Sequence, residues 1–207
     1  MIKNTVFDWS GVIKDAVKSH SWVVNKMFKE LGGKEISMDE MKENWKQPYM
    51  HFYNKYLPNL TIEEEQKAYK EAILHKDCPD SNAYPGIVDF IKKLKNVGFF
   101  LALITSDLPE TFVSEIEKYD LKDVFDEVVV NAYDKTESLK DLIKKYSLDP
   151  KKTFFIGDSN HEIEAAKEAK CKSIAVTWGF STRERLGKEN PDFTVDSIEE
   201  LEKILLK

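Results

Sequence analysis

Short apolar runs alternate along most of the chain with segments whose apolar residues recur at helical spacing. The apolar runs are Thr5 to Phe7, Phe99 to Ile104, Val128 to Val130, Thr153 to Ile156 and Ser173 to Val176. Near-continuous apolar runs of this length are typical of parallel strands that are covered on both faces. Helical spacing lies between them, at about 86–97, 110–119, 136–147 and 161–170. The alternation predicts an α/β fold with a doubly wound parallel sheet.

One long stretch breaks this alternation and shows helical spacing alone. Its helical segments are Ser21 to Leu31, Asp39 to Tyr56, and Thr61 to about His75. The last of them begins with Thr61-Ile62-Glu63-Glu64, which is the spacing of a capping box. We therefore expect an α/β core domain made of residues 1–13 and 83–207, with an all-helical cap domain, residues 14–82, inserted after the first strand.

Charge and composition narrow the classes of partner. The 207 residues include 31 Lys+Arg and 37 Asp+Glu, and the formal net charge of −6 gives no general attraction for nucleic acid or an anionic membrane. No apolar run approaches the ~20 residues that span a bilayer, and the first residues show no signal-peptide pattern. Cys78 and Cys171 lack the spacing of a metal or redox motif. We expect a cytoplasmic protein, monomer or homodimer, that binds an anionic ligand locally.

Polar side chains follow four of the predicted strands, where ligands of open α/β sheets bind. Each of these residues alone is readily explained as a helix cap, a turn former or a solvated charge. In chain order, however, they offer a carboxylate, hydroxyl groups, a lysine and further carboxylates, which suits a phosphate and a hard cation. The segments are Asp8-Trp9-Ser10-Gly11, Thr105-Ser106-Asp107, Asp134-Lys135, and Gly157-Asp158 with Glu162.

This ordered set resembles the haloacid dehalogenase superfamily, in its branch of phosphoglycolate phosphatases and β-phosphoglucomutases with a helical cap. The resemblance implies a hydrolase of a small phosphorylated metabolite, with Asp8 as the nucleophile that forms an aspartyl-phosphate. It also implies that Thr105 and Lys135 hold the phosphoryl group, with Ser106 and Gly11 beside it. The implied Mg²⁺ ligands are Asp8, the backbone carbonyl of Ser10, Asp158 and Glu162, the last standing where the family usually has Asp.

Ser10 departs from the family pattern. Phosphatases of this family carry an aspartate two residues after the nucleophile, where it protonates the leaving oxygen and later activates water. A serine hydroxyl is too weak an acid for this work, and general acid–base catalysis is typically worth ~10²–10⁴-fold in rate. Three interpretations stay open: a slow phosphatase, a catalytically silent phosphate-binding or regulatory protein, and a phosphonate hydrolase.

Two residues of the expected cap are further candidates. His20 lies at the entry into the cap and is expected either to assist proton transfer at the substrate or to be a hinge or core histidine. Lys46 is the candidate for the Schiff-base lysine that the phosphonate hydrolases use, and its simpler interpretation is a solvent-facing charge.

Overall fold

The sheet of this protein consists of six parallel strands in the order β3-β2-β1-β4-β5-β6. The computed structural model describes residues 3–46 and 48–207. All five of the predicted strands are present, and the fold class is confirmed. The strands are β1 (Asn4–Phe7), β2 (Phe100–Ile104), β3 (Glu127–Val129), β4 (Thr153–Gly157), β5 (Lys172–Val176) and β6 (Phe193–Val195).

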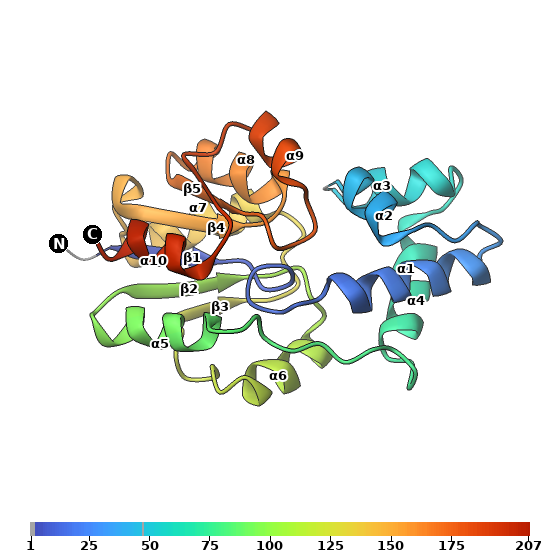
Figure 1. Cartoon of the computed structure of the whole chain (residues 1–207), viewed down its shortest axis with the longest axis horizontal. Helices are drawn as coiled ribbons and strands as arrows, with labels where there is room; N and C mark the ends of the chain where they lie inside the picture. The colour runs from blue at the N-terminus through green and yellow to red at the C-terminus, as the bar shows by residue number, and fades with distance from the viewer. Residues whose placement is uncertain (1–2, 47) are drawn as a thin grey trace.

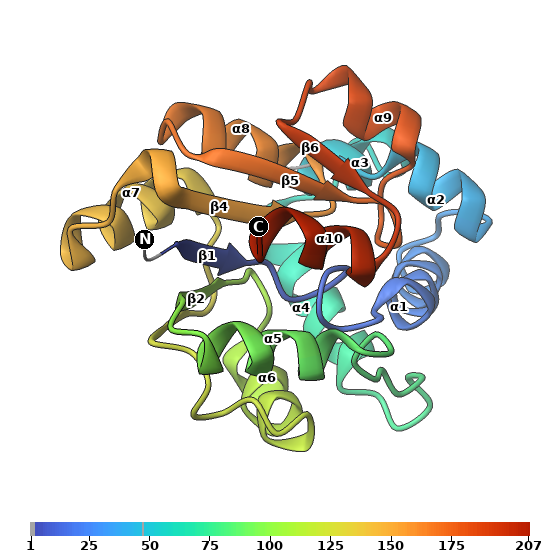
Figure 2. The same cartoon turned by 60° about the vertical axis from the view of Figure 1, so that its left-hand side comes forward.

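Helices cover both faces of the sheet, because successive strand residues point to opposite sides. Phe7 and Ile156 pack with α5, α6 and α10, whereas Val6 and Phe155 pack with α7 and α8. The result is a three-layer core, which Figure 2 shows with the sheet between its helices. The helices of the core are α5 (Ile87–Asn96), α6 (Pro109–Lys118), α7 (Lys135–Tyr146), the 3₁₀ turn η1 (Pro150–Lys152), α8 (Asn160–Glu168), α9 (Arg183–Lys188) and α10 (Ile198–Leu205).

The C-terminal part of the core holds the elements that the sequence pattern did not reveal. Strand β6 has three residues and helix α9 has six, so neither is long enough to display a clear period. Helix α10 begins at the Ser197 N-cap and buries Leu201 and Leu205 against the sheet. None of the helices in residues 3–46 and 48–207 combines the length and the apolar character that a membrane span requires.

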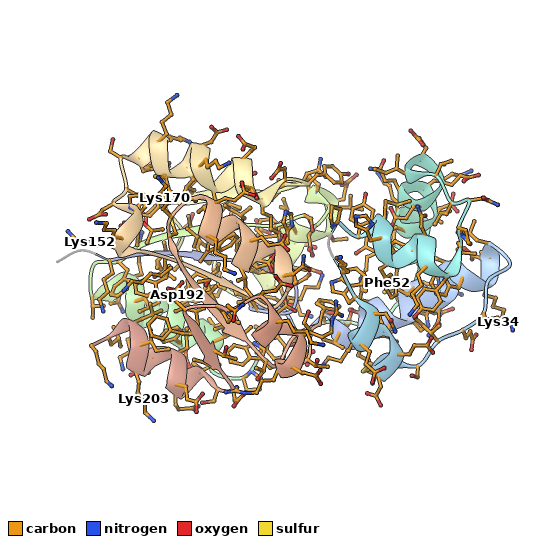
Figure 3. All side chains as sticks on the ribbon, turned by 90° about the horizontal axis from the view of Figure 1, so that it is seen from above. Lys34, Phe52, Lys152, Lys170, Asp192 and Lys203 are labelled. Carbon is orange, nitrogen blue, oxygen red and sulfur yellow. The ribbon has the colours of Figure 1, made fainter. Side chains whose placement is uncertain are left out.

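The first four of the described helices that follow β1 form a separate bundle beside the core, seen at the right of Figure 1. They are α1 (Val17–Glu30), α2 (Met38–Asn44), α3 (Met50–Tyr56) and α4 (Ile62–Ile73). They enclose their own apolar cluster, with Phe28, Met41 and Phe52 fully buried. Figure 3 shows Phe52 inside this bundle, away from the side chains of the sheet. The domain boundaries at residues 14 and 82 stay a prediction.

The expectation of one helical segment from Asp39 to Tyr56 is wrong. Helix α2 ends at Asn44 and α3 begins at Met50. Pro48 lies in between, and a proline has no backbone N–H to continue a helix and clashes with the preceding turn.

The two chain segments that join the bundle to the core run side by side. The Asp15 N–H donates to the Asn82 carbonyl at 2.8 Å, and the Tyr84 N–H donates to the Ile13 carbonyl at 2.8 Å. Lys14 lies between them, 4% exposed, and its ammonium is 2.6 Å from Glu115 and 3.4 Å from Asp107 on the core. This buried ion pair and the two backbone hydrogen bonds fix where the bundle leaves the sheet.

Candidate active site

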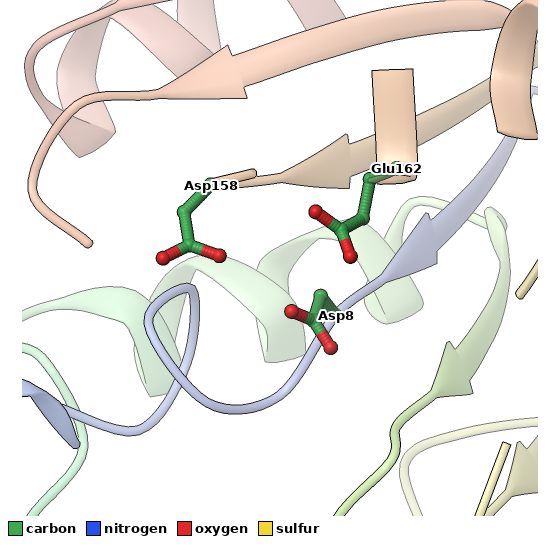
Figure 4. A group of neighbouring side chains, drawn as sticks. All are labelled: Asp8, Asp158 and Glu162. Carbon is green, nitrogen blue, oxygen red and sulfur yellow. The ribbon is translucent and has the colours of Figure 1, made fainter. Parts of the chain in front are cut away.

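Three carboxylates meet beyond the ends of β1 and β4. Asp8 directly follows β1, Asp158 directly follows β4, and Glu162 lies in the first turn of α8. One oxygen of each lies within 4.8 Å of the others, and all three side chains are buried. Figure 4 shows the carboxylates facing a common space. Because β1 and β4 are neighbours in the sheet, their carboxyl ends bring these residues together although they lie far apart in sequence.

Lys135, the first residue of α7, is the cation of this cluster. Its ammonium is 2.7 Å from Asp8 Oδ1 and 2.6 Å from Glu162 Oε1, and the residue is 3% exposed. The α7 N-cap at Asp134, whose side chain accepts from the Thr136 and Glu137 N–H groups, sets the position of Lys135 at the helix start. One ammonium and three carboxylates leave an excess of buried negative charge, which is costly without a further cation.

The pKa values of the carboxylates differ because their partners differ. Burial raises the pKa of Asp8 to about 7, although Lys135 opposes the shift. Burial also raises the pKa of Asp158 well above its usual range, and the charges of Asp8 and Glu162 raise it further. Burial acts in the same direction on Glu162, but Lys135 outweighs it and the pKa falls to about 2. Glu162 is therefore the carboxylate that balances Lys135.

Glu162 has both of its oxygens engaged. Oε1 meets Lys135, while Oε2 accepts from the Ser159 N–H at 3.0 Å and the Ser159 hydroxyl at 2.7 Å. The second set of bonds is a capping box at the start of α8. Asp158 uses Oδ2 to accept from the Phe180 N–H at 2.5 Å. The donor set of hard carboxylate oxygens fits Mg²⁺, with Asp8 and Asp158 holding oxygens that face the common space.

Gly11 allows the loop after β1 to pass directly against Asp158. Its φ is +89°, and a Cβ at this position would lie 2.1 Å from Asp158 Oδ2. A side chain here would displace the carboxylate, so Gly11 shapes the site without offering a ligand of its own.

The hydroxyl of Ser10 points to a carboxylate that sequence reasoning did not single out. Ser10 Oγ donates to Asp107 Oδ2 at 2.8 Å. Thr105 Oγ1 donates to Asp107 Oδ1 at 3.1 Å and accepts from the Asp107 N–H at 3.0 Å. Thr105 is fully buried within its own loop, while Ser106 and Asp107 line the cavity described below. The only sequence signal for Asp107 is its place in the loop after β2.

A cavity of about 270 Å³ extends from this cluster to the helical bundle. Asp8, Ser10, Lys135, Asp158 and Glu162 line its inner end. His20 also lines it, in edge contact with Trp45 at 4.6 Å and Phe180 at 5.2 Å between ring centroids. Burial lowers the pKa of His20 to about 4, so its ring is neutral near pH 7.

The two cap candidates therefore occupy different environments. His20 faces the cavity, and its Nε2 is buried and has no hydrogen-bond partner among the described residues. Lys46 is exposed and does not line the cavity. The placement of Lys46 gives no support to a Schiff base at this position.

Sequence comparison identifies the class of protein that this arrangement represents. Residues 5–176 match the family model of the haloacid dehalogenase-like hydrolases, and the chain belongs to this family. A phosphoglycolate phosphatase of Aquifex aeolicus is 26% identical over 205 residues, which cover 97% of this chain and 95% of the relative. A phosphoglycolate phosphatase of Vibrio vulnificus is 31% identical over 132 residues, covering 61% of this chain and 58% of the relative.

Solved structures share the fold over the whole chain. A haloacid dehalogenase-like hydrolase of Streptococcus pneumoniae superimposes with a TM-score of 0.83 at 20% identity, over 98% of each chain. A protein of Clostridium acetobutylicum described as a predicted phosphatase reaches a TM-score of 0.84 at 22% identity, over 100% of this chain and 99% of its own. At these identities the similarity establishes the fold alone.

Proposed function

We propose that the protein is a Mg²⁺-dependent phosphatase that hydrolyses a small phosphate monoester through Asp8. The observation that carries the proposal is the position of Asp8, held 2.7 Å from Lys135 and grouped with Asp158 and Glu162 at the strand ends. The relatives that are named phosphoglycolate phosphatases support the same class of reaction.

Each group of the inner cavity has a role in this reaction. An oxygen of Asp8 attacks phosphorus, the bond to the leaving alkoxide breaks, and the resulting aspartyl-phosphate is hydrolysed by water. Lys135 stabilises the charge on the phosphoryl oxygens and holds Asp8 in place, and Glu162 fixes Lys135. Ser106 and the loop after β2 line the same cavity and would lie beside the phosphoryl group.

The proposed metal ligands are Asp8, Asp158 and the backbone carbonyl of Ser10, with Glu162 acting mainly through Lys135 and Ser159. When bound, Mg²⁺ supplies charge neutralisation and a template for the phosphate oxygens. This assignment is consistent with the excess of buried negative charge that Lys135 leaves unbalanced.

Ser10 limits the rate of the proposed reaction. Its hydroxyl cannot protonate an alkoxide near pH 7, and it is already bonded to Asp107. Leaving groups that need little protonation, such as nitrophenolate, should therefore be released faster than simple alcohols. The same observation motivates a second candidate, a protein that binds the phosphate ester without turnover.

The direct test is turnover of p-nitrophenyl phosphate with Mg²⁺. We expect activity that is abolished by chelation of the metal and reduced on the order of 10⁴-fold in Asp8→Asn, since a nucleophile has no substitute. Asp123→Asn, which alters an exposed carboxylate after α6, is the matched control and should keep full activity. Turnover that survives in Asp8→Asn would refute the mechanism, and binding without any turnover would favour the silent candidate.

A further inference from the structure

The outer half of the cavity, next to the helical bundle, has a composition unlike that of the inner half. Aromatic rings make up most of its wall and come from the segment between α2 and α3, from α3 and α4, and from two core loops. Rings of this kind present a partly negative face, which attracts cations. The rings are those of Trp45, Tyr49, Tyr53, Tyr69, Tyr133 and Phe180.

A single carboxylate stands among these rings. Glu65, in the first turn of α4, lines the cavity and is 3% exposed. Its carboxylate has no hydrogen bond or ion pair with any residue in 3–46 or 48–207. Burial of a carboxylate without a partner costs free energy. The start of α4 offsets part of this cost, because a helix N-terminus favours negative charge. The rest calls for a partner that enters the cavity.

A second polar group nearby also lacks a partner. The hydroxyl of Tyr53 is buried and has no hydrogen bond within the described part of the chain, and the residue is 1% exposed. Burial raises the pKa of this hydroxyl well above its usual range, and the Glu65 carboxylate raises it further. Both groups line the same cavity, and together they offer a carboxyl group and a neutral donor or acceptor to one ligand.

The outer half holds no free cation among the described residues that line it. Lys70 lies at the rim, half exposed, and its ammonium is 2.7 Å from Glu110. Lys135 is already shared by Asp8 and Glu162, and His20 is neutral near pH 7. A substrate whose leaving group carries a carboxylate, such as phosphoglycolate, would meet Glu65 with no cation to balance it.

We propose that the outer half binds a protonated amine, so that the substrate is a phosphate monoester of a small amino alcohol. Its ammonium would donate to Glu65 and lie against the faces of the surrounding rings, with Tyr53 Oη as a further acceptor. The phosphate would lie at the inner half, as the proposed function requires. The inference rests on that function for the position of the phosphate, but not for the chemistry of the outer half.

Binding to the Asp8→Asn protein with Mg²⁺ tests this proposal without turnover. Calorimetry should show that 2-aminoethyl phosphate binds about 10- to 100-fold more tightly than ethyl phosphate, which has the same phosphate and no amine. Phosphoglycolate should bind more weakly than ethyl phosphate. Equal affinities for the amine and ethyl esters, tighter binding of phosphoglycolate, or binding of none of the three would overturn the proposal.

Glu65→Gln and Glu63→Gln, each added to Asp8→Asn, form the matched pair. Both lie in the first turn of α4, but Glu63 is exposed and outside the cavity. The preference for the amine should disappear with Glu65→Gln and persist with Glu63→Gln, and its persistence in both would refute the role of Glu65. Failure of the phosphatase proposal has a separate signature, since the protein with native Asp8 would then leave p-nitrophenyl phosphate intact while the calorimetric preference remained.

Discussion

The two halves of the cavity differ in how completely their polar groups are paired. At the inner half, Lys135 contacts two carboxylates within 2.7 Å, and Glu162 is held by three donors. At the outer half, the Glu65 carboxylate and the Tyr53 hydroxyl have no hydrogen-bond or ion-pair partner among the described residues. Side chains of the protein itself therefore pair Lys135 and Glu162 at the inner half, whereas we propose that a ligand pairs the polar groups of the outer half. Under this proposal, reaction chemistry and substrate choice belong to different parts of the cavity.

Loss of Lys135 should produce the largest effect, because it removes the ammonium that pairs with Asp8 and Glu162 at the inner half. Lys135→Met leaves Asp8 and Glu162 buried without their cation, and we expect a loss of about 3–5 kcal/mol in the free energy of unfolding without metal. The loss of phosphoryl stabilisation should lower kcat/KM for p-nitrophenyl phosphate by about 10²–10³-fold. Urea unfolding with a chelator and steady-state kinetics with Mg²⁺ measure the two effects.

Lys140→Met is the control for this substitution. Lys140 lies on the same helix, but it is partly exposed and pairs at the surface with Glu137 and Glu168. Such pairs are worth about 0–1 kcal/mol, so this variant should remain close to the native stability. Similar stability of the two variants would contradict the view that the inner half depends on Lys135.

Restoring the family's aspartate at position 10 should have a smaller effect. In Ser10→Asp alone, the new carboxylate would face Asp107, which now accepts a hydrogen bond from Ser10 at 2.8 Å. Like charges at this distance oppose each other, so we expect little gain in activity. Ser10→Asp combined with Asp107→Asn removes the conflict, and its kcat for an alkyl phosphate should rise by about 10²-fold.

The single variant Asp107→Asn separates the effect of removing the Asp107 charge from the effect of introducing an acid at position 10. It removes the carboxylate without supplying an acid, so its kcat for an alkyl phosphate should not rise above that of the native protein. A rise in Asp107→Asn as large as in the double variant would show that Asp107 itself limits the reaction, and that an aspartate at position 10 is not the missing part.

Sequence reasoning located the inner half because its residues follow strands. A buried parallel strand is visible as an apolar run, and the residue after it must lie at the edge of the sheet, as Asp8 and Asp158 do. The prediction that these residues and Lys135 belong to one region follows from strand order alone. The identification of the family and of the doubly wound fold rests on the same ordered pattern.

The outer half could not be located in this way. Glu65 lies in a helix start with three acidic residues in its first turn, and nothing in the sequence distinguishes it from its exposed neighbours Glu63 and Glu64. Its burial depends on how α4 packs against α1 in the bundle, which the helical period does not specify. Asp107 was missed for a similar reason, since its contact with Ser10 spans 97 residues of sequence.

The pH dependence of stability gives the smallest of the expected effects and tests the unpaired half directly. Burial raises the pKa of Glu65 from 4.5 to about 7. The residues whose pKa it influences, Tyr49, Tyr53 and Tyr69, are all neutral in this range. Between these two pKa values the folded chain binds more protons than the unfolded chain, so this carboxyl group makes stability fall as pH rises. The full shift corresponds to about 3 kcal/mol, lost by pH 8.

Glu65→Gln removes this titration while keeping the shape of the side chain. Its free energy of unfolding should equal that of the native protein near pH 4.5 and exceed it by about 1–3 kcal/mol at pH 8, because the native carboxylate is then buried with its charge. Glu63→Gln should show no such dependence on pH. A constant difference between Glu65→Gln and the native protein from pH 4.5 to 8 would mean that Glu65 already has a partner in the free protein, and the contrast between the two halves of the cavity would be lost.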